Sequence, residues 1–261
     1  MLKILFCCPV LDIRYEWFIG FLEIHKELES HHDWDVTYMF PYRKPVQIAD
    51  TNAVRKAIKE DFDYILRMDD DVWDIPYGSV EQLMKADKDA ISAVMYCNGF
   101  PYQRCAGVKE EIAKNMTLME LTKYKEEPYV HELDKLGVQP VDLTAFPFIL
   151  FKVSMFKVIP EPWFVGDEDA PTDSYFCQKM ADYGFQPYVD MGIQVNHRGI
   201  THLNRKSRYI EDMNKYLLTG QYDGNDALHK KFMALYEKMR AEDKTKKGEV
   251  KDECIFSPEV S

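Results

Sequence analysis

Three consecutive aspartates, Asp69, Asp70 and Asp71, follow the apolar run 64–68 and concentrate negative charge where a strand is expected to end. Ionised carboxylates at this spacing repel one another, and a hard divalent ion such as Mg2+ or Mn2+ relieves that repulsion through oxygen ligands. Such an ion keeps positions open for phosphate oxygens. The triplet therefore predicts a cation site that receives a phosphorylated ligand; a solvated acidic turn is the alternative.

The residues before the triplet alternate between apolar runs and helical patterns. Residues 2–10 form an unbroken apolar run, which is typical of a strand buried on both faces of a mainly parallel sheet. A helical pattern follows, and then a second strand over 35–40. Asp50 is expected to cap the next helix, and 64–68 forms the third strand, so the triplet lies at a strand's carboxyl end.

Further along, Ser79 is expected to cap a short helix, and a fourth strand follows over 90–96. This order predicts a doubly wound α/β sheet, in which ligands bind outside the carboxyl ends of the strands. Residues 98–140 are aromatic, charged and weakly periodic, and they are expected to leave the sheet. The later elements are expected to be an apolar strand over 146–151, a Pro-rich corner at 160–164, a helix over 172–183 and a strand over 188–195.

Composition limits the function classes. The 261 residues are 46% hydrophobic, which suffices for a sizeable core. The six cysteines lack the paired spacings of a zinc site, so reduced thiols are expected. The formal charge of -11 argues against a broad nucleic-acid surface. Because we find no apolar stretch of spanning length and no secretory leader, a cytoplasmic protein without a membrane span is expected.

Four stretches, taken in order, resemble the GT-A glycosyltransferases, in particular the family 2-like enzymes that use nucleotide-sugar donors. They are 64–72 with its DxD element, Pro162–Phe164, Thr172–Gly184 and Val195–Gly199. The resemblance implies the GT-A fold, with a Rossmann-like, mainly parallel central sheet flanked by helices and a C-terminal helical extension. The implied domains are a catalytic domain at 1–205, made of a nucleotide-sugar-binding half (1–97) and an acceptor-side half (98–205), then C-terminal helices (206–241) and a polar tail (242–261).

In that family the DxD carboxylates hold a divalent metal, Mn2+ or Mg2+, that bridges the two donor phosphates. The matching residues are Asp69 and Asp71, with Asp71 as the direct ligand. Asp69 would face the ribose or the sugar, and Asp70 would contact the donor or solvent. His197 resembles the histidine that completes the coordination of the metal, although a lone histidine at a strand end is often structural.

The resemblance also implies roles on the acceptor side. Asp173 aligns with the acid that takes a proton from the acceptor hydroxyl in inverting members. Helix capping is the competing role, and Thr172 departs from the Glu-Asp pair that usually opens this helix. Asp167, Glu168 and Asp169 are nearby acids that could serve instead of Asp173, and Asp167 is expected to bind the acceptor. Trp163 would stack on the acceptor or fill the core.

On the donor side, Pro9 and Asp12 follow the first strand, where similar enzymes seat the nucleotide base. Arg43 and Arg55 are expected where the family often has an arginine near the donor, and a surface charge is the alternative for each. A basic cluster would clamp a diphosphate or meet an anionic acceptor, unless it is a solvated loop. It comprises His197, Arg198, His202, Arg205, Lys206 and Arg208.

The expected function is a metal-dependent glycosyltransferase, a hexosyl- or pentosyltransferase, that moves a sugar from a UDP-type donor to a hydroxyl acceptor with inversion. The acceptor would be a glycan or a hydroxymethylated base in DNA, and the setting a bacterial cytosol or a phage-infected host cell. One alternative is a nucleotidyltransferase acting on a sugar phosphate, which the missing glycine-rich loop at 7–12 disfavours. The other is a non-catalytic nucleotide-sugar binding module, which Thr172 favours.

Overall fold

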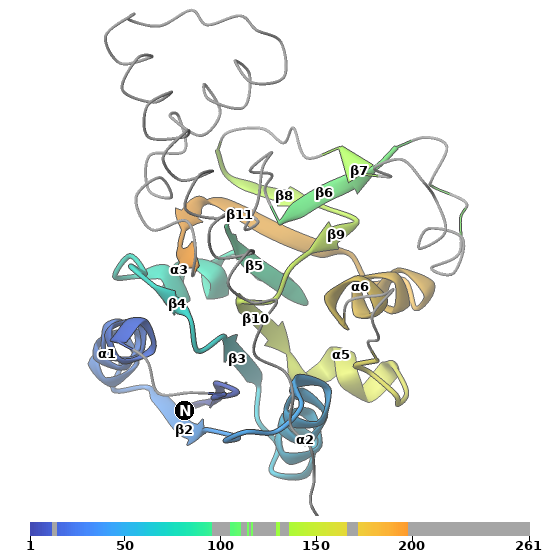
Figure 1. Cartoon of the computed structure of the whole chain (residues 1–261). Helices are drawn as coiled ribbons and strands as arrows, with labels where there is room; N and C mark the ends of the chain where they lie inside the picture. Colours follow the sequence, from blue (N-terminus) through green and yellow to red (C-terminus); the bar gives the residue numbers. More distant parts are fainter. Residues whose placement is uncertain are drawn as a thin grey trace, which may run out of the picture. The chain divides into compact units, whose positions relative to one another are not determined.

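A seven-stranded β-sheet with helices packed on both faces organises the described part of the chain (Figure 1). The structure is a computed structural model. It describes residues 1–11, 15–95, 105–110, 114, 116, 129–130, 136–165 and 172–197. Its first elements are β1 (Leu2–Cys7), α1 (Tyr15–Ser30), β2 (Trp34–Met39), α2 (Val46–Lys59), β3 (Tyr64–Met68), β4 (Val72–Trp73), α3 (Ser79–Lys85) and β5 (Ala90–Val94).

The later elements complete the main sheet and add two small ones. They are β6 (Ala106–Lys109), β7 (Tyr129–Val130), β8 (Val138–Pro140), β9 (Leu143–Thr144), β10 (Phe148–Lys152), α5 (Val153–Val158), α6 (Thr172–Asp182), β11 (Pro187–Gln194) and β12 (Asn196–His197). The order of the main sheet is β2-β1-β3-β10-β5-β11-β8, while β7, β6 and β9 form one small sheet and β12 pairs with β4. The described helices are all too short or too polar to cross a bilayer.

The sheet is mixed but mostly parallel. β1 pairs in parallel with β2 and β3, and β5 pairs in parallel with β11. β10 is antiparallel to both β3 and β5, and β8 is antiparallel to β11. Hence β1, β2, β3, β5 and β11 run in one direction, and their carboxyl ends share one edge. The predicted α/β class is confirmed. The sequence did not predict that the strand at 146–151 lies between β3 and β5 and runs in the opposite direction.

Alternation along the central strands divides the core between the two faces of the sheet. On β10, Phe148 and Leu150 pack with α1 and α3, whereas Ile149 and Phe151 pack with α2, α5 and α6. β1 alternates in the same way. Side chains on both faces are buried, which explains why these strands read as continuous apolar runs instead of alternating patterns.

Two expected helix caps are wrong. α2 begins at Val46 with Pro45 as its N-cap, so Asp50 lies in the helix interior, where its side chain is buried. Proline suits such a start because it supplies a fixed φ and lacks an N–H group that would need a partner. The N-cap of α3 is Gly78, and Ser79 is the first helical residue. The predicted C-terminal helices and tail lie beyond the last described residue.

Candidate functional site

The acidic triplet lies directly after β3, at the edge where the parallel strands end. The backbone N–H of Asp69 donates to the carbonyl of Pro147 at 2.8 Å, which extends the pairing of β3 with the β10 side. The carboxylate of Asp70 accepts the backbone N–H of Leu11 at 2.7 Å and ties the triplet to the loop after β1. The predicted position of the triplet at a strand's carboxyl end is therefore confirmed.

The loops after β1 and β2 are joined beside this edge. Val10 and Tyr42 form an isolated parallel bridge, and the N–H of Arg43 donates to the carbonyl of Val10 at 2.8 Å. Arg43 has a left-handed backbone with φ of 50°, and its guanidinium lies 5.1 Å from the centroid of the Tyr42 ring. The sheet edge thus gathers Pro9 and Arg43, two of the expected donor-side residues. Asp12 lies outside the described ranges.

β4 continues the chain from the triplet and pairs with β12. In this antiparallel pair, the backbone of His197 lies opposite Val72, the residue that follows Asp71. Nδ2 of Asn196 donates to Asp74 at 3.1 Å and adds a side-chain link between the segments. Backbone pairing therefore brings the two parts of the predicted metal site, which are distant in the sequence, to one place.

Helix α1 packs against β4 with no space for a side chain at their contact. A Cβ atom built on Gly20 would lie 2.1 Å from the carbonyl oxygen of Val72. Because that neighbour is a backbone atom, any larger residue at position 20 has to push α1 and β4 apart. This glycine therefore fixes how closely the segment after the triplet approaches the helix.

Two carboxylates of α1, one turn apart, bind the backbone of the segment that follows β4. Glu23 accepts the N–H of Ile75 at 2.8 Å. Glu27 accepts the N–H groups of Gly78 at 3.0 Å and Glu81 at 2.9 Å. Burial raises the pKa of Glu27, and these backbone donors oppose the shift. Glu27 thus satisfies the free donors at the start of α3 in place of a local cap.

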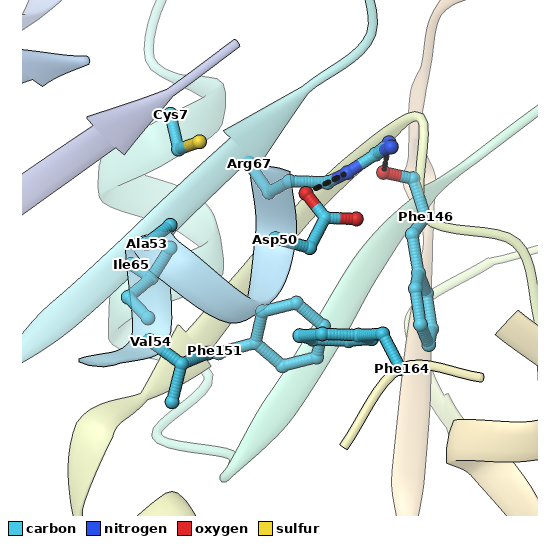
Figure 2. A pocket seen from close by; sticks show the side chains of 9 residues that line it. All are labelled: Cys7, Asp50, Ala53, Val54, Ile65, Arg67, Phe146, Phe151 and Phe164. Atoms are coloured by element: carbon cyan, nitrogen blue, oxygen red, sulfur yellow. Dashed lines mark hydrogen bonds and ion pairs between the residues drawn. The ribbon is translucent and has the colours of Figure 1, made fainter. Parts of the chain in front are cut away.

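Arg67 is the charged residue of β3, and its side chain is buried between Asp50 and the carbonyl of Phe146 (Figure 2). Its Nη1 donates to the carbonyl of Phe146 at 2.5 Å and lies 2.8 Å from Oδ1 of Asp69. Its Nε lies 3.4 Å from Oδ1 of Asp50 on α2. The side chains of Arg67 and Asp50 are only 7% and 5% exposed, whereas that of Asp69 is 29% exposed. The guanidinium therefore connects a buried acid with one at the surface.

Arg67 and the two aspartates, Asp50 and Asp69, stabilise one another's charged forms. Burial by itself would lower the pKa of Arg67, but the negative charges of Asp50 and Asp69 raise the pKa above its ordinary value. Burial raises the pKa of Asp50, and the guanidinium opposes that shift. Arg67 consequently keeps its proton and supplies positive charge directly beneath an acidic surface.

Asp173 lies in the first turn of α6, and its Oδ1 accepts the N–H of Ser174 at 2.8 Å. Burial raises the pKa of Asp173. Among the charges that act on it, Arg67 lowers the pKa and Asp69 raises it. The raised pKa of Asp173 is in the direction that suits a group accepting a proton.

For Trp163 and Arg55, the structure favours the non-functional one of the two alternatives that the sequence left open. Trp163 is 4% exposed, packs edge-on against Phe156 and donates its indole N–H to the carbonyl of Ile159, so it is a core residue and not an acceptor platform. Arg55 forms an exposed ion pair with Glu161, which agrees with the surface-charge alternative. Asp167 and the basic cluster from Arg198 onward lie outside the described part of the chain.

The described side chains form no group of three or more histidines, cysteines or acids that could hold a metal ion by themselves. This is compatible with Mg2+ or Mn2+, because such ions are commonly held by one or two carboxylates together with substrate phosphates. The oxygens of Asp69 and Asp71 are suitable hard donors. The donor set therefore fits an ion that binds together with a phosphorylated ligand.

The sequence did not identify four residues that support the site. They are Asp50, Arg67, Glu23 and Glu27. A signal existed for Arg67, because a charged residue inside a buried apolar strand must have a partner. No comparable signal distinguished the two glutamates, since acidic residues on a helix are usually solvated. Their partners are backbone atoms, which no sequence pattern identifies.

No family model matches the chain, and no curated protein matches it. Among solved structures, the chain is similar to the crystal structure of A197 from STIV. The sequence identity is 15%, the TM-score is 0.47, and the match covers 76% of this chain and 85% of that chain.

Proposed function

We propose that this protein is a metal-dependent glycosyltransferase of the GT-A type, which uses a nucleotide-diphosphate sugar, a UDP-sugar in the first instance. The observation that carries the proposal is the pairing of Val72 with His197, which brings the histidine segment to the acidic triplet at the carboxyl edge of a mostly parallel sheet. This edge is where α/β proteins bind ligands. Asp173, in the first turn of α6, would be the acid on the acceptor side.

Asp71 and His197 would hold the ion, and Asp69 would bind it or face the ribose or sugar. A bound divalent ion would neutralise the charge that grows on the diphosphate as the sugar departs. Pro9 and Arg43 would line the base and phosphate end of the donor. Asp70 would hold the loop after β1 in place through its bond to Leu11.

Asp173 would act as the base. The acceptor hydroxyl oxygen forms a bond to the anomeric carbon while the bond from that carbon to the phosphate oxygen breaks, and the hydroxyl proton passes to the Asp173 carboxylate. A partly desolvated carboxylate with a raised pKa is a better proton acceptor than a solvated one. Attack from the face opposite the leaving group would invert the anomeric configuration.

The proposal is tested by following nucleotide release from UDP-sugars with Mn2+, in the presence and absence of a chelator. Turnover in the wild type that is lost with chelator and in Asp71→Ala supports it. Asp33→Ala is the matched control, because Asp33 is an exposed aspartate that precedes β2 at the opposite edge of the sheet. The control is expected to retain turnover.

The acceptor requires a separate screen of defined glycans, peptides and hydroxymethylated DNA with the donor that binds best. NMR analysis of the anomeric configuration of the product then tests the role of Asp173, since a retained configuration removes it as the base. Nucleotide-sugar binding without turnover toward any acceptor or water would favour a binding module instead.

A further inference from the structure

Arg67 contacts acceptors from three separate parts of the fold. Asp50 comes from α2, the carbonyl of Phe146 from the segment before β10, and Asp69 from the end of β3. Two of these acceptors are buried, and only Asp69 reaches the surface. A guanidinium can satisfy several acceptors at once because its donors lie in a rigid planar fork. Arg67 therefore links the interior to one member of the triplet.

Such an arrangement is a poor way to gain stability. The cavity beside Asp50 and Arg67 is otherwise lined by apolar or thiol-bearing side chains, including Val54, Phe151 and Phe164 (Figure 2). Removing two charges from water costs about as much as their attraction returns, and apolar residues of similar volume often serve as well or better. The buried pair thus calls for a reason other than stability.

The geometry indicates that the buried Arg67–Asp50 pair orients Asp69. Its Oδ1 is held at 2.8 Å by a cation that Asp50 and Phe146 hold in turn, so the rotation of the carboxylate is restricted. The same positive charge offsets the repulsion between Asp69 and the neighbouring acids of the triplet. Oδ1 of Asp69 is consequently committed to Arg67, while the Asp69 side chain remains 29% exposed.

We infer that Arg67, anchored by Asp50, is a positioning residue that fixes the carboxylate of Asp69 for contact with the donor, most directly with a hydroxyl of its ribose or sugar. The inference rests on the proposed function for the identity of the ligand. It assigns Asp69 to hydrogen bonding with the donor and leaves Asp71 as the main carboxylate ligand of the metal.

The inference is tested by the affinity for UDP with Mn2+, measured by titration calorimetry, in Arg67→Met, Asp69→Asn and the double variant. Residues that support metal-binding side chains contribute about 10-fold to 100-fold to metal affinity, and we expect a loss of comparable size in Arg67→Met. If Arg67 acts through Asp69, adding Arg67→Met to Asp69→Asn causes little further loss. Independent losses that multiply in the double variant would overturn the inference.

A kinetic readout separates positioning from general damage. With Arg67→Met we expect the donor KM to rise more than kcat falls, and Asp50→Asn to give a smaller change in the same direction. Arg67→Lys serves if the methionine variant fails to fold, because it keeps the charge but cannot reach three acceptors. Donor affinity equal to that of the wild type in Arg67→Lys would show that the planar guanidinium is not required, and would overturn the inference. Lys152→Met is the matched control, since Lys152 forms an ion pair with Asp87 at the other end of β10.

A crystal structure of Arg67→Met or Arg67→Lys without ligand makes the test independent of the reaction. A changed Asp69 rotamer, with the backbone of β3 unchanged, supports the inference. An unmoved Asp69 carboxylate overturns it whether or not any nucleotide binds. If the wild type binds no nucleotide at all, the proposed function fails, and this structure still decides whether Arg67 positions Asp69.

Discussion

The backbone N–H of Leu11 donates to the carboxylate of Asp70 at 2.7 Å and joins the loop after β1 to the acidic triplet after β3. The middle aspartate therefore has a structural partner of its own, separate from the contact of Asp69 with Arg67. Each of these two neighbouring acids is held by a different element. Two of the three carboxylates of the triplet therefore have defined partners in the fold.

Replacing Asp70 by alanine should release the loop after β1. A hydrogen bond from a backbone N–H to a charged acceptor contributes about 1.5 to 3 kcal/mol, and its partial exposure should leave about 1 kcal/mol here. We expect urea denaturation to show a loss of this size, together with a higher donor KM. Asp70→Asn, which keeps an acceptor oxygen, should lose less. Equal losses in both variants would contradict this account of the Leu11 contact.

Gly20→Ala should separate α1 from β4. The new Cβ meets the backbone oxygen of Val72, and overpacking of this kind costs about 1 to 3 kcal/mol. Because β4 adjoins the triplet, we also expect lower turnover. Gly192→Ala is the control, as its nearest neighbours are side-chain atoms at 3.1 Å that can move. Thermal denaturation showing equal effects at both positions would argue against a special contact at Gly20.

Trp163→Phe separates the core role of this residue from an acceptor role. Phenylalanine keeps the packing against Phe156 but loses the bond to the Ile159 carbonyl, so a loss of about 1 kcal/mol in unfolding free energy is expected. The acceptor KM should stay unchanged. A large rise in acceptor KM without loss of stability would instead restore Trp163 to the acceptor site.

The buried thiols predict a loss of stability in alkali. Burial raises the pKa of Cys8 and Cys177 to about 12, from an ordinary value of 9.0. The folded state holds these protons more tightly, so their stabilising contribution is complete below pH 9 and disappears as the pH rises toward 12. The unfolding free energy from urea denaturation should therefore fall from pH 9 to pH 10.5, on the order of 1 kcal/mol per thiol for each pH unit.

The matched comparison is the double variant Cys8→Ala, Cys177→Ala. Its unfolding free energy should be lower at neutral pH, because cavities form, but its dependence on pH above 9 should be shallower. An identical slope in the variant and the wild type would mean that other groups cause the alkaline loss.

Much of the fold could be predicted because apolar runs and helical periods mark strands and helices directly. The run at 64–68 and the helix around Asp173 are examples, and both agree with β3 and α6. The direction of each strand and its neighbours in the sheet could not be predicted in the same way. The run at 146–151 carries no sign that β10 inverts between β3 and β5, since residues buried on both faces look alike in either direction.

The candidate site was also predictable only in part. Charge density identified the triplet, and position after a strand located it at the sheet edge. What surrounds the triplet depends on partners that are distant in the sequence, such as Asp50, which looks like a helix cap but lies inside α2 against Arg67. Trp163 shows the converse, because an aromatic at a Pro-rich corner has the same local pattern whether it meets a ligand or the core.

The most direct test is a crystal of the protein soaked with UDP and Mn2+. We predict an ion bound by an oxygen of Asp71 and by the nucleotide's diphosphate, with His197 beside it. The Asp69 carboxylate should keep its contact with Arg67. A nucleotide bound elsewhere, or a triplet that meets only solvent at saturating concentrations of both, would contradict the central claim.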